Sequence, residues 1–182
     1  MIDPSDVLPR SQPIATGHLR LTPLQPQDAD RLFPVLNDTL LHRFIAGRPD
    51  TLEELRARYE RWAGERSPDG TEAWLNWTVR TEEDIVVGTV QATVSTTGAR
   101  WLATVSWIVG TDHQGLGYAT EAARALVSWL EEHGVAVIEA YVHADHAASA
   151  AVARGAGLRP TDRRVGEEVV WRSPTRPSSH AG

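Results

Sequence analysis

The sequence contains no cysteine among its 182 residues. Disulfide bonds, thiolate nucleophiles and cysteine-ligated zinc sites are therefore excluded, while the redox compartment stays open. No stretch approaches the ~18 apolar residues of a membrane-spanning helix. The first residues also have neither a basic start nor an apolar run, so they do not resemble a signal peptide. We therefore expect a cytoplasmic protein with no membrane association.

The sequence also has fewer basic residues than acidic residues. Lys and Arg number 18 against 24 Asp and Glu, a formal net charge of −6. Proteins that bind nucleic acid carry a basic footprint, so this balance argues against a nucleic-acid partner. The hydrophobic fraction of 41% and the charged fraction of 23% are typical of a globular chain. The length allows one core to form without metal or disulfide staples.

The composition does not change along the chain, and no internal repeat is visible. We expect a single domain over residues 1–182 with an ordered core at about 18–172. The two ends, 1–17 and 173–182, are rich in Pro, Ser and Gly, so we expect them to be flexible.

Hydrophobic periodicity predicts the element order βαα-βββ-αβ-αββ. Period-two alternation predicts strands at 18–24, 73–80, 85–95, 101–109, 135–142, 158–165 and 168–172. Helical spacing predicts helices at 27–37, 51–63, 117–133 and 147–154. Short turns join the strands at 73–109, so we expect an antiparallel meander, with a bulge at Gly88. This arrangement belongs to the mixed α+β class.

A glycine-containing turn at residues 114–120 follows the meander and opens a helix. Free N–H groups and the helix dipole converge at such a turn and create an anion site. The stretch Gly115-Leu116-Gly117 alone also fits an ordinary tight turn. No Lys-Ser or Lys-Thr follows it, which excludes a P-loop. A dinucleotide fold needs a βαβ unit, whereas the strands before this turn form a meander, so the turn does not fit a dinucleotide site.

These motifs resemble the GNAT superfamily of N-acetyltransferases, closest to the RimJ/RimL-type ribosomal-protein N-terminal acetyltransferases, over residues 18–172. In that family the pyrophosphate loop reads Gln or Arg, two residues, Gly, one residue, then Gly or Ala. Gln114, Gly117 and Ala119 occupy those places. The resemblance implies a mostly antiparallel sheet of about seven strands, splayed between the fourth and fifth, with about four flanking helices.

The resemblance further implies acetyl-coenzyme A as the acyl donor, without a metal. The acceptor would be an amine-bearing small molecule or a protein N-terminus, and a homodimer is compatible with it. A second family motif, commonly His-Pro-Asp-Asn-x-x-Ser, reads His-Ala-Asp-His-Ala-Ala-Ser at 143–149. The residues expected to bind the coenzyme are Trp107, Ile108, Val109, Gln114, Gly115, Leu116, Gly117, Tyr118, Ala119, Thr120, His146 and Ser149.

The expected catalytic residues are Ser149, His143 and Thr104. Thr104 stands where the family often has a Glu base, and a threonine cannot act as a base at neutral pH. Either the amine arrives neutral or another group takes its proton, the candidates being His143, Glu72, Asp112 and His113. The short helix after Ser149 contains no Tyr, so Ser149 is expected to contact the sulfur.

Two alternatives to acetyl transfer stay open. One is an acyl-coenzyme A sensor without turnover, motivated by Thr104 and His146 at positions that usually carry function. The other is a longer acyl group such as succinyl, for which no basic partner is evident. The acceptor groove would be built by the two early helices, the loop 41–49 and the last two strands. Groove aromatics would come from Trp74, Trp77, Trp101 and Trp107.

Overall fold

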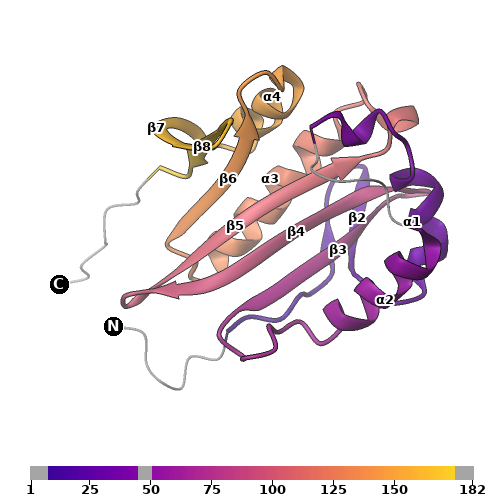
Figure 1. The fold of residues 1–182 in the computed structure, drawn as a ribbon, viewed down its shortest axis with the longest axis horizontal. Coiled ribbons are helices and arrows are strands. Elements are labelled where there is room, and N and C mark those ends of the chain that lie inside the picture. The colour runs from indigo at the N-terminus through magenta and orange to yellow at the C-terminus, as the bar shows by residue number, and fades with distance from the viewer. Residues whose placement is uncertain (1–7, 45–50, 175–182) are drawn as a thin grey trace.

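The computed structural model describes residues 8–44 and 51–174, and one sheet dominates this part of the chain (Figure 1). Its strands are β1 (Ile14–Ala15), β2 (Leu19–Pro23), β3 (Ala73–Thr81), β4 (Val86–Thr97), β5 (Arg100–Val109), β6 (Val137–His143), β7 (Arg159–Val165) and β8 (Glu168–Arg172). The order in space is β1-β2-β3-β4-β5-β6-β8-β7. Only the β5–β6 pair is parallel among these neighbours.

Four α-helices and two short 3₁₀ helices accompany the sheet in the described residues. They are α1 (Asp28–Leu36), η1 (Leu41–Arg43), α2 (Leu52–Trp62), η2 (Thr111–His113), α3 (Tyr118–Glu132) and α4 (Ala147–Gly155). The expected α+β class, the four helices and the mostly antiparallel sheet are therefore confirmed. The expected strand number of seven is one too low, because two-residue β1 is too short to show an alternation.

Parts of both ends make main-chain contacts. Ile14 and Ala15, within the end expected to be flexible, pair with Leu21 and Arg20 of β2. At the other end the Ser173 N–H donates to the Ile138 carbonyl over 2.8 Å. Residues 1–7 and 175–182 lie outside the described part.

The expected meander is β3-β4-β5, and the bulge lies beside Gly88 as predicted. Val79 pairs with Gly88 while Arg80 pairs with Val86, so Val87 is the extra residue. Gly88 also faces β5 closely, because a Cβ built there would lie 2.0 Å from the Ile108 carbonyl oxygen. Only glycine fits between these strands without moving one of them.

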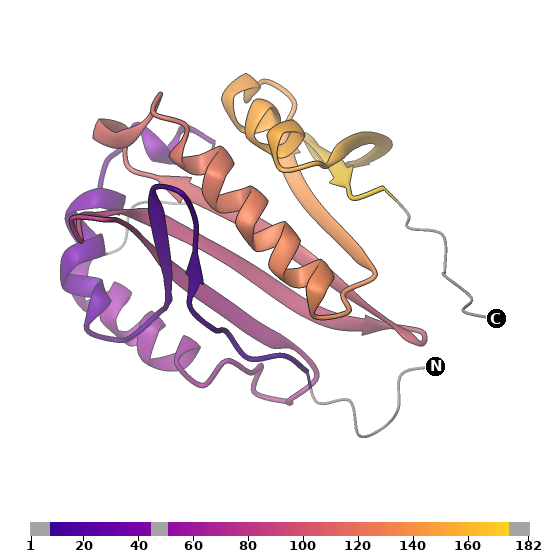
Figure 2. The same ribbon diagram turned by 180° about the vertical axis from the view of Figure 1, so that it is seen from behind.

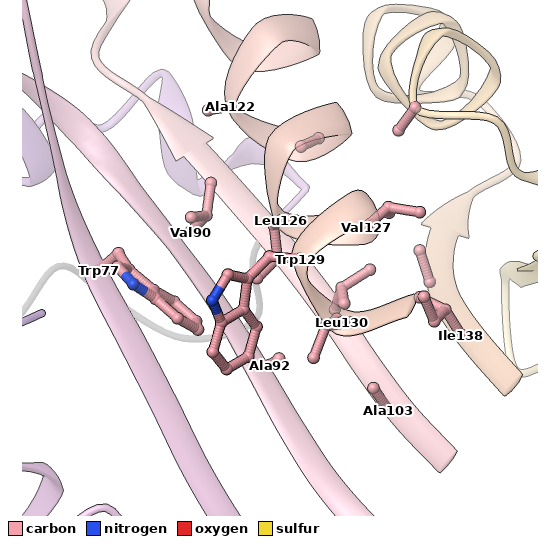
Figure 3. Close-up of a cluster of buried hydrophobic side chains, with 14 of the residues drawn as sticks. Trp77, Val90, Ala92, Ala103, Ala122, Leu126, Val127, Trp129, Leu130 and Ile138 are labelled. Atoms are coloured by element: carbon pink, nitrogen blue, oxygen red, sulfur yellow. The ribbon is translucent and has the colours of Figure 1, made fainter. Parts of the chain in front are cut away.

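One face of the sheet is covered by α3, with α4 beside it (Figure 2). Apolar residues of α3 recur at helical spacing and pack on the strands. Trp129 meets Trp77 of β3 edge-on with ring centroids 5.3 Å apart, and Leu126 and Leu130 lie beside it (Figure 3). Trp77 is fully buried here, so its expected role in a groove is wrong.

The opposite face carries α1 and α2, the helices nearest the viewer in Figure 1. They form a second apolar cluster around Leu32, Leu55 and Tyr59. A buried ion pair between Arg80 of β3 and Asp28 of α1, 2.5 Å apart, ties this layer to the sheet. Successive strand residues point to opposite faces, so this face receives the alternate residues that the α3 core does not use.

Candidate active site

The two strands β5 and β6 pair only briefly and then separate. Their parallel pairing covers Leu102, Ala103 and Thr104 opposite Val137, Ile138 and Glu139. Beyond these pairs β5 continues to Val109 along β4, while β6 runs to His143 along β8 (Figure 1). This separation confirms the expected splay between the fourth and fifth predicted strands. We call the opening between β5 and β6 the strand gap.

Alternation along β5 decides which main-chain groups face the strand gap. The Trp101 carbonyl accepts the Ala136 N–H on the β6 side, whereas the Gly110 N–H donates to Val87 on the β4 side. The N–H and C=O of one residue share an edge, and successive residues alternate. Trp107 and Val109 therefore present their main chain to the gap, while the peptide groups of Ile108 face β4.

The predicted phosphate turn lies directly beyond the end of β5. Gly115 and Gly117 adopt positive φ angles of 75° and 83°, and a Cβ at either would meet no atom within 4 Å. Gly117 is the N-cap of α3 and offers no side-chain cap. The first amides of the helix, at Tyr118, Ala119 and Thr120, have no acceptor in a preceding turn. The exposed turn 114–117 and the free amides of half-buried 118–120 thus form one array of donors, which we call the donor array.

The Gln114 side chain points back toward β5. Its Nε2 donates to the Val109 carbonyl over 3.0 Å. Val109 keeps its N–H facing the strand gap, since only its carbonyl is engaged. Gln114 therefore joins the turn to the splayed strand, and the donor array and the gap form one continuous surface.

Helix α4 approaches this surface from the other side of the gap. A Cβ on Gly155 would lie 2.5 Å from the Thr120 Cγ2 atom, so the two helices touch. His146 caps α4, its Nδ1 accepting the Ser149 N–H at 3.4 Å. Burial, and secondarily the neighbouring His143, lowers the pKa of His146. The Ser149 hydroxyl is half-buried at the first turn.

Phe44 lies against the β6 and α4 side of the strand gap. Its ring stacks on His146 at a centroid distance of 4.2 Å and lies 5.4 Å from the His143 ring. At the other end of the same segment, the Thr111 hydroxyl, just after β5, lowers the pKa of Asp38. The segment 38–44 therefore crosses from the end of β5 to the end of β6.

Two adjoining cavities lie on the sheet face that α1 and α2 cover. The larger, about 110 Å³, is lined by Phe33, Leu36, Asn37, Leu41, His42, Leu55, Arg58, Tyr59, Trp62, Thr89, Gln91 and Ile108. The smaller, about 90 Å³, is lined by Trp62, Trp74, Asn76, Gln91, Ala92 and Thr93. They share Trp62 and Gln91, and we call them together the sheet-face groove. Trp74 is thus in the groove as expected, whereas Trp101 and Trp107 pack against the α3 core.

A family model described as "Acetyltransferase (GNAT) domain" matches residues 18–159. The chain belongs to the GNAT acetyltransferase domain family. The resemblance inferred from residues 114–122 and 143–149 is therefore confirmed at the level of the family. A comparison of the sequence with curated proteins found no match.

Solved structures share the GNAT fold over nearly the whole chain. A GNAT-family acetyltransferase from Bacillus anthracis is 18% identical with a TM-score of 0.70, covering 88% of this chain and 96% of its own. RimL, a ribosomal L7/L12 α-N-protein acetyltransferase in complex with coenzyme A, is 15% identical with a TM-score of 0.74, covering 88% and 97%. AAC(6')-Ib in complex with paromomycin and acetyl-coenzyme A is 19% identical with a TM-score of 0.68, covering 87% and 93%.

No helix within residues 8–44 and 51–174 is long and apolar enough to cross a membrane.

Within this GNAT fold the predicted catalytic residues belong to three different elements. Thr104 is the last residue of β5 that pairs with β6, and its partner there is Glu139. His143 lies at the far end of β6, and Ser149 lies on α4. Both ring nitrogens of His143 are engaged, Nε2 with Glu167 at 3.2 Å and Nδ1 with the Asp145 N–H at 3.1 Å.

The other predicted bases lie just before β3 and in η2. Glu72 accepts the Trp74 indole N–H over 2.9 Å and precedes β3, whose first residue Ala73 lies at the opposite end of the meander from Val109. Asp112 and His113 belong to η2, between β5 and the phosphate turn. None of them lines the sheet-face groove in the described part of the chain.

Sequence reasoning missed a buried carboxylate beside Thr104. Glu139 is 2% exposed, and its Oε1 accepts from Arg163 over 2.9 Å and from Arg172. A charged residue inside an apolar strand is a visible signal, because such residues are buried only when paired. Its two arginine partners lie on β7 and β8, so no local pattern predicts the cluster.

Glu121, in the first turn of α3, holds the N-terminal hairpin against the phosphate turn. Its carboxylate accepts from the Thr16 hydroxyl at 2.6 Å and the His18 N–H at 2.8 Å. Burial raises the pKa of Glu121, but the hydrogen bonds from Thr16 and His18 outweigh it, so the net pKa is lowered. Its charge is therefore directed toward β1 and β2 rather than toward the free amides.

Replacing Glu121 by Gln should destabilise the protein in a pH-dependent way. A lowered folded pKa gives stability that is present above the unfolded pKa of about 4.3 and lost as pH falls through the folded value. We expect E121Q to reduce the free energy of unfolding by about 1 kcal/mol at pH 7. Urea denaturation at about pH 7 and about pH 3 checks this. Glu132→Gln, an exposed carboxyl on the same helix, is the control, and an equal deficit at both pH values would contradict the prediction.

Proposed function

We propose that the protein is an N-acetyltransferase that transfers an acetyl group from acetyl-coenzyme A to a primary amine. The observation that carries the proposal is the continuity of the strand gap with the donor array at the start of α3. An extended arm can add to the free edge of β5 as a further strand. A pyrophosphate at its end then meets the helix N-terminus.

The residues present fit this donor. The amides at 118–120 follow two glycines in the left-handed region with open space at their Cβ positions, and no side-chain cap competes for these amides. Trp107 and Val109 offer main-chain groups to the amides of the pantetheine arm. The bound donor supplies a thioester whose carbonyl carbon accepts the amine. N–H groups at the same edge stabilise the negative charge that develops on the carbonyl oxygen.

The acceptor amine is expected to enter from the sheet-face groove. Ser106 pairs with Gln91 in the β4–β5 ladder, and Gln91 pairs with Asn76 of β3. These three polar residues share the face on which the groove opens, beside Ile108 of the splayed segment. Donor and acceptor therefore reach β5 from different directions, and direct attack in a ternary complex needs no covalent enzyme intermediate.

Release of free thiol from acetyl-coenzyme A in the presence of a panel of amines tests the proposal, with the acetylated product identified by mass. We expect release that depends on both the amine and the protein. Tight coenzyme binding without release from any acceptor would support the sensor alternative and overturn the enzyme. Faster release from succinyl-coenzyme A than from acetyl-coenzyme A would assign the longer donor.

The charge of the groove predicts which amines are used. Among the described residues that line the two cavities there is no Asp or Glu, whereas Arg58 lines the larger cavity and lies 5.7 Å from the centroid of the Trp62 ring. A second cationic group on the acceptor would find no carboxylate among these lining residues and would lie near the guanidinium of Arg58.

We therefore expect acceptors with one amine and an apolar or aromatic body to be preferred over polyamines. Phenethylamine or a short peptide with a free N-terminus should exceed spermidine in kcat/KM by at least about 10-fold, or about 1.4 kcal/mol. Competition assays at fixed acetyl-coenzyme A measure the ratio. Arg58→Gln should lower this ratio of kcat/KM values. Arg20→Gln, on the outer strand β2, removes the same charge and is the control. Preference for spermidine by the unaltered protein would contradict the prediction.

A further inference from the structure

His42 differs from the other histidines around the strand gap because one ring nitrogen is buried without a partner. Its Nε2 lies 3.3 Å from the Leu36 carbonyl oxygen. A carbonyl can only accept, so Nε2 carries the hydrogen, and the neutral ring leaves a lone pair on Nδ1. That Nδ1 atom is buried and has no hydrogen-bond partner among the described residues.

A buried acceptor without a partner is unusual, since its desolvation costs about 1–3 kcal/mol when no hydrogen bond replaces water. His42 lines the larger cavity of the sheet-face groove, so its side chain is part of the wall of the site proposed for the acceptor. An amine that reached Nδ1 from the groove would supply the missing donor.

The position of His42 also brings it close to the strand gap. Ile108, in the splayed part of β5, lines the same cavity. Two residues later, Phe44 contacts His143 and His146 across the gap. His42 therefore lies in the segment that spans the gap, on the side from which the acceptor would approach.

We propose that His42 is the catalytic base that takes the proton of the acceptor amine, an inference that rests on the proposed acetyltransferase function. A proton passes from the ammonium group to Nδ1, and the nitrogen lone pair freed in this way forms the new C–N bond. The C–S bond breaks, and its electron pair leaves on sulfur. A second proton leaves the nitrogen, and sulfur takes up one proton, so the products are an amide and a free thiol with one proton released to solvent.

Four charged or titratable groups face this position from the packed elements. Asp38 lies four residues before His42. Its own pKa is lowered by the Thr111 hydroxyl, by the Leu40 N–H and by the positive charge of His42. Arg58 and Tyr59 line the same cavity from α2, and Arg43 follows His42 on η1. The β4 and β5 residues of the larger cavity, Thr89, Gln91 and Ile108, are uncharged.

His42→Gln should lower kcat about 100-fold at pH 7, the effect expected for loss of a general base. KM for acetyl-coenzyme A should stay within about 2-fold of its original value, because the proposed role of His42 concerns the acceptor amine and not the donor. The loss of kcat in H42Q relative to the unaltered protein should fall below about 10-fold near pH 10, where the amine is neutral without a catalytic base. The acid limb of the pH profile of kcat should disappear in the variant.

His133→Gln is the matched control, since the His133 Nδ1 also bonds a main-chain carbonyl, that of Trp129 at 2.7 Å, but at the far end of α3. It should keep kcat and its acid limb. Coenzyme A binding by calorimetry reports whether H42Q folds. If H42Q does not bind coenzyme A, His42→Asn replaces it as the test variant, together with the pH profile of kcat of the unaltered protein. Absence of an acid limb from the profile of the unaltered protein overturns the proposal.

Failure of this inference and failure of the proposed function give different results. Unchanged kcat in H42Q, with thiol release from the unaltered protein, would overturn His42 as the base and leave the acetyltransferase intact. No thiol release from the unaltered protein with any amine would overturn the function, and His42 with it.

Discussion

Gly88→Ala should lower the free energy of unfolding by about 3 kcal/mol, at the upper end of what an overpacked core site costs. The added Cβ would lie 2.0 Å from the Ile108 carbonyl oxygen and 3.0 Å from the Val109 Cα atom. Both are main-chain atoms of a central strand, so a rotamer change cannot relieve the clash. Either β4 or β5 must move at the bulge.

The movement should also reach the donor site, because the displaced segment of β5 forms the edge of the strand gap. We expect a folded fraction of G88A to show a KM for acetyl-coenzyme A raised at least 10-fold. Urea denaturation and initial rates measure the two effects. Gly64→Ala is the control, since a Cβ at Gly64 would lie no closer than 3.8 Å to a neighbouring atom, the Arg61 carbonyl oxygen. Equal stability of G88A and G64A would contradict the prediction.

Gly117→Val should weaken acetyl-coenzyme A binding at least 100-fold, or about 2.8 kcal/mol. A β-branched residue at a φ of 83° is strained, and its side chain would project into the open space beside the first amides of α3. Relief of that strain rotates the amides away from the pyrophosphate, while the methyl groups exclude it directly. Calorimetric titration with coenzyme A measures the loss.

Gly98→Val separates strain from binding. Gly98 has a φ of 62° and open space around it, but it lies in the turn between β4 and β5 at the far end of the meander. We expect both variants to lose about 1–2 kcal/mol of stability and only G117V to lose affinity. If G98V weakens coenzyme A binding as much as G117V does, position 117 has no specific role in the site.

The donor side of the site is readable from the sequence because its chemistry is local. Glycines before a helix, Gln114 and the start of α3 lie within a few residues of one another, and the meander that precedes them follows from simple alternation. Alternation also implies that Trp107 and Val109 share an edge of β5 that Ile108 does not. The sequence does not say which edge faces the gap, since this depends on the pairing of β6.

The acceptor side is less readable because it is assembled from distant segments. His42 and Phe44 follow no periodic pattern, and their positions depend on how the segment 38–44 crosses from β5 to β6. Trp74 and Trp77 lie three residues apart on one strand, so they point to opposite faces. Only the placement of α3 shows that Trp77 is the core residue.

Strand β5 serves two separate tasks with alternate residues. Ala103 and Val105 point into the core beneath α3, whereas Thr104 and Ser106 point to the opposite face, toward the groove. Substitutions at the second pair can therefore accumulate without disturbing the packing that supports the first. Related proteins built on such a strand can therefore evolve to use different amine substrates while their coenzyme site stays the same.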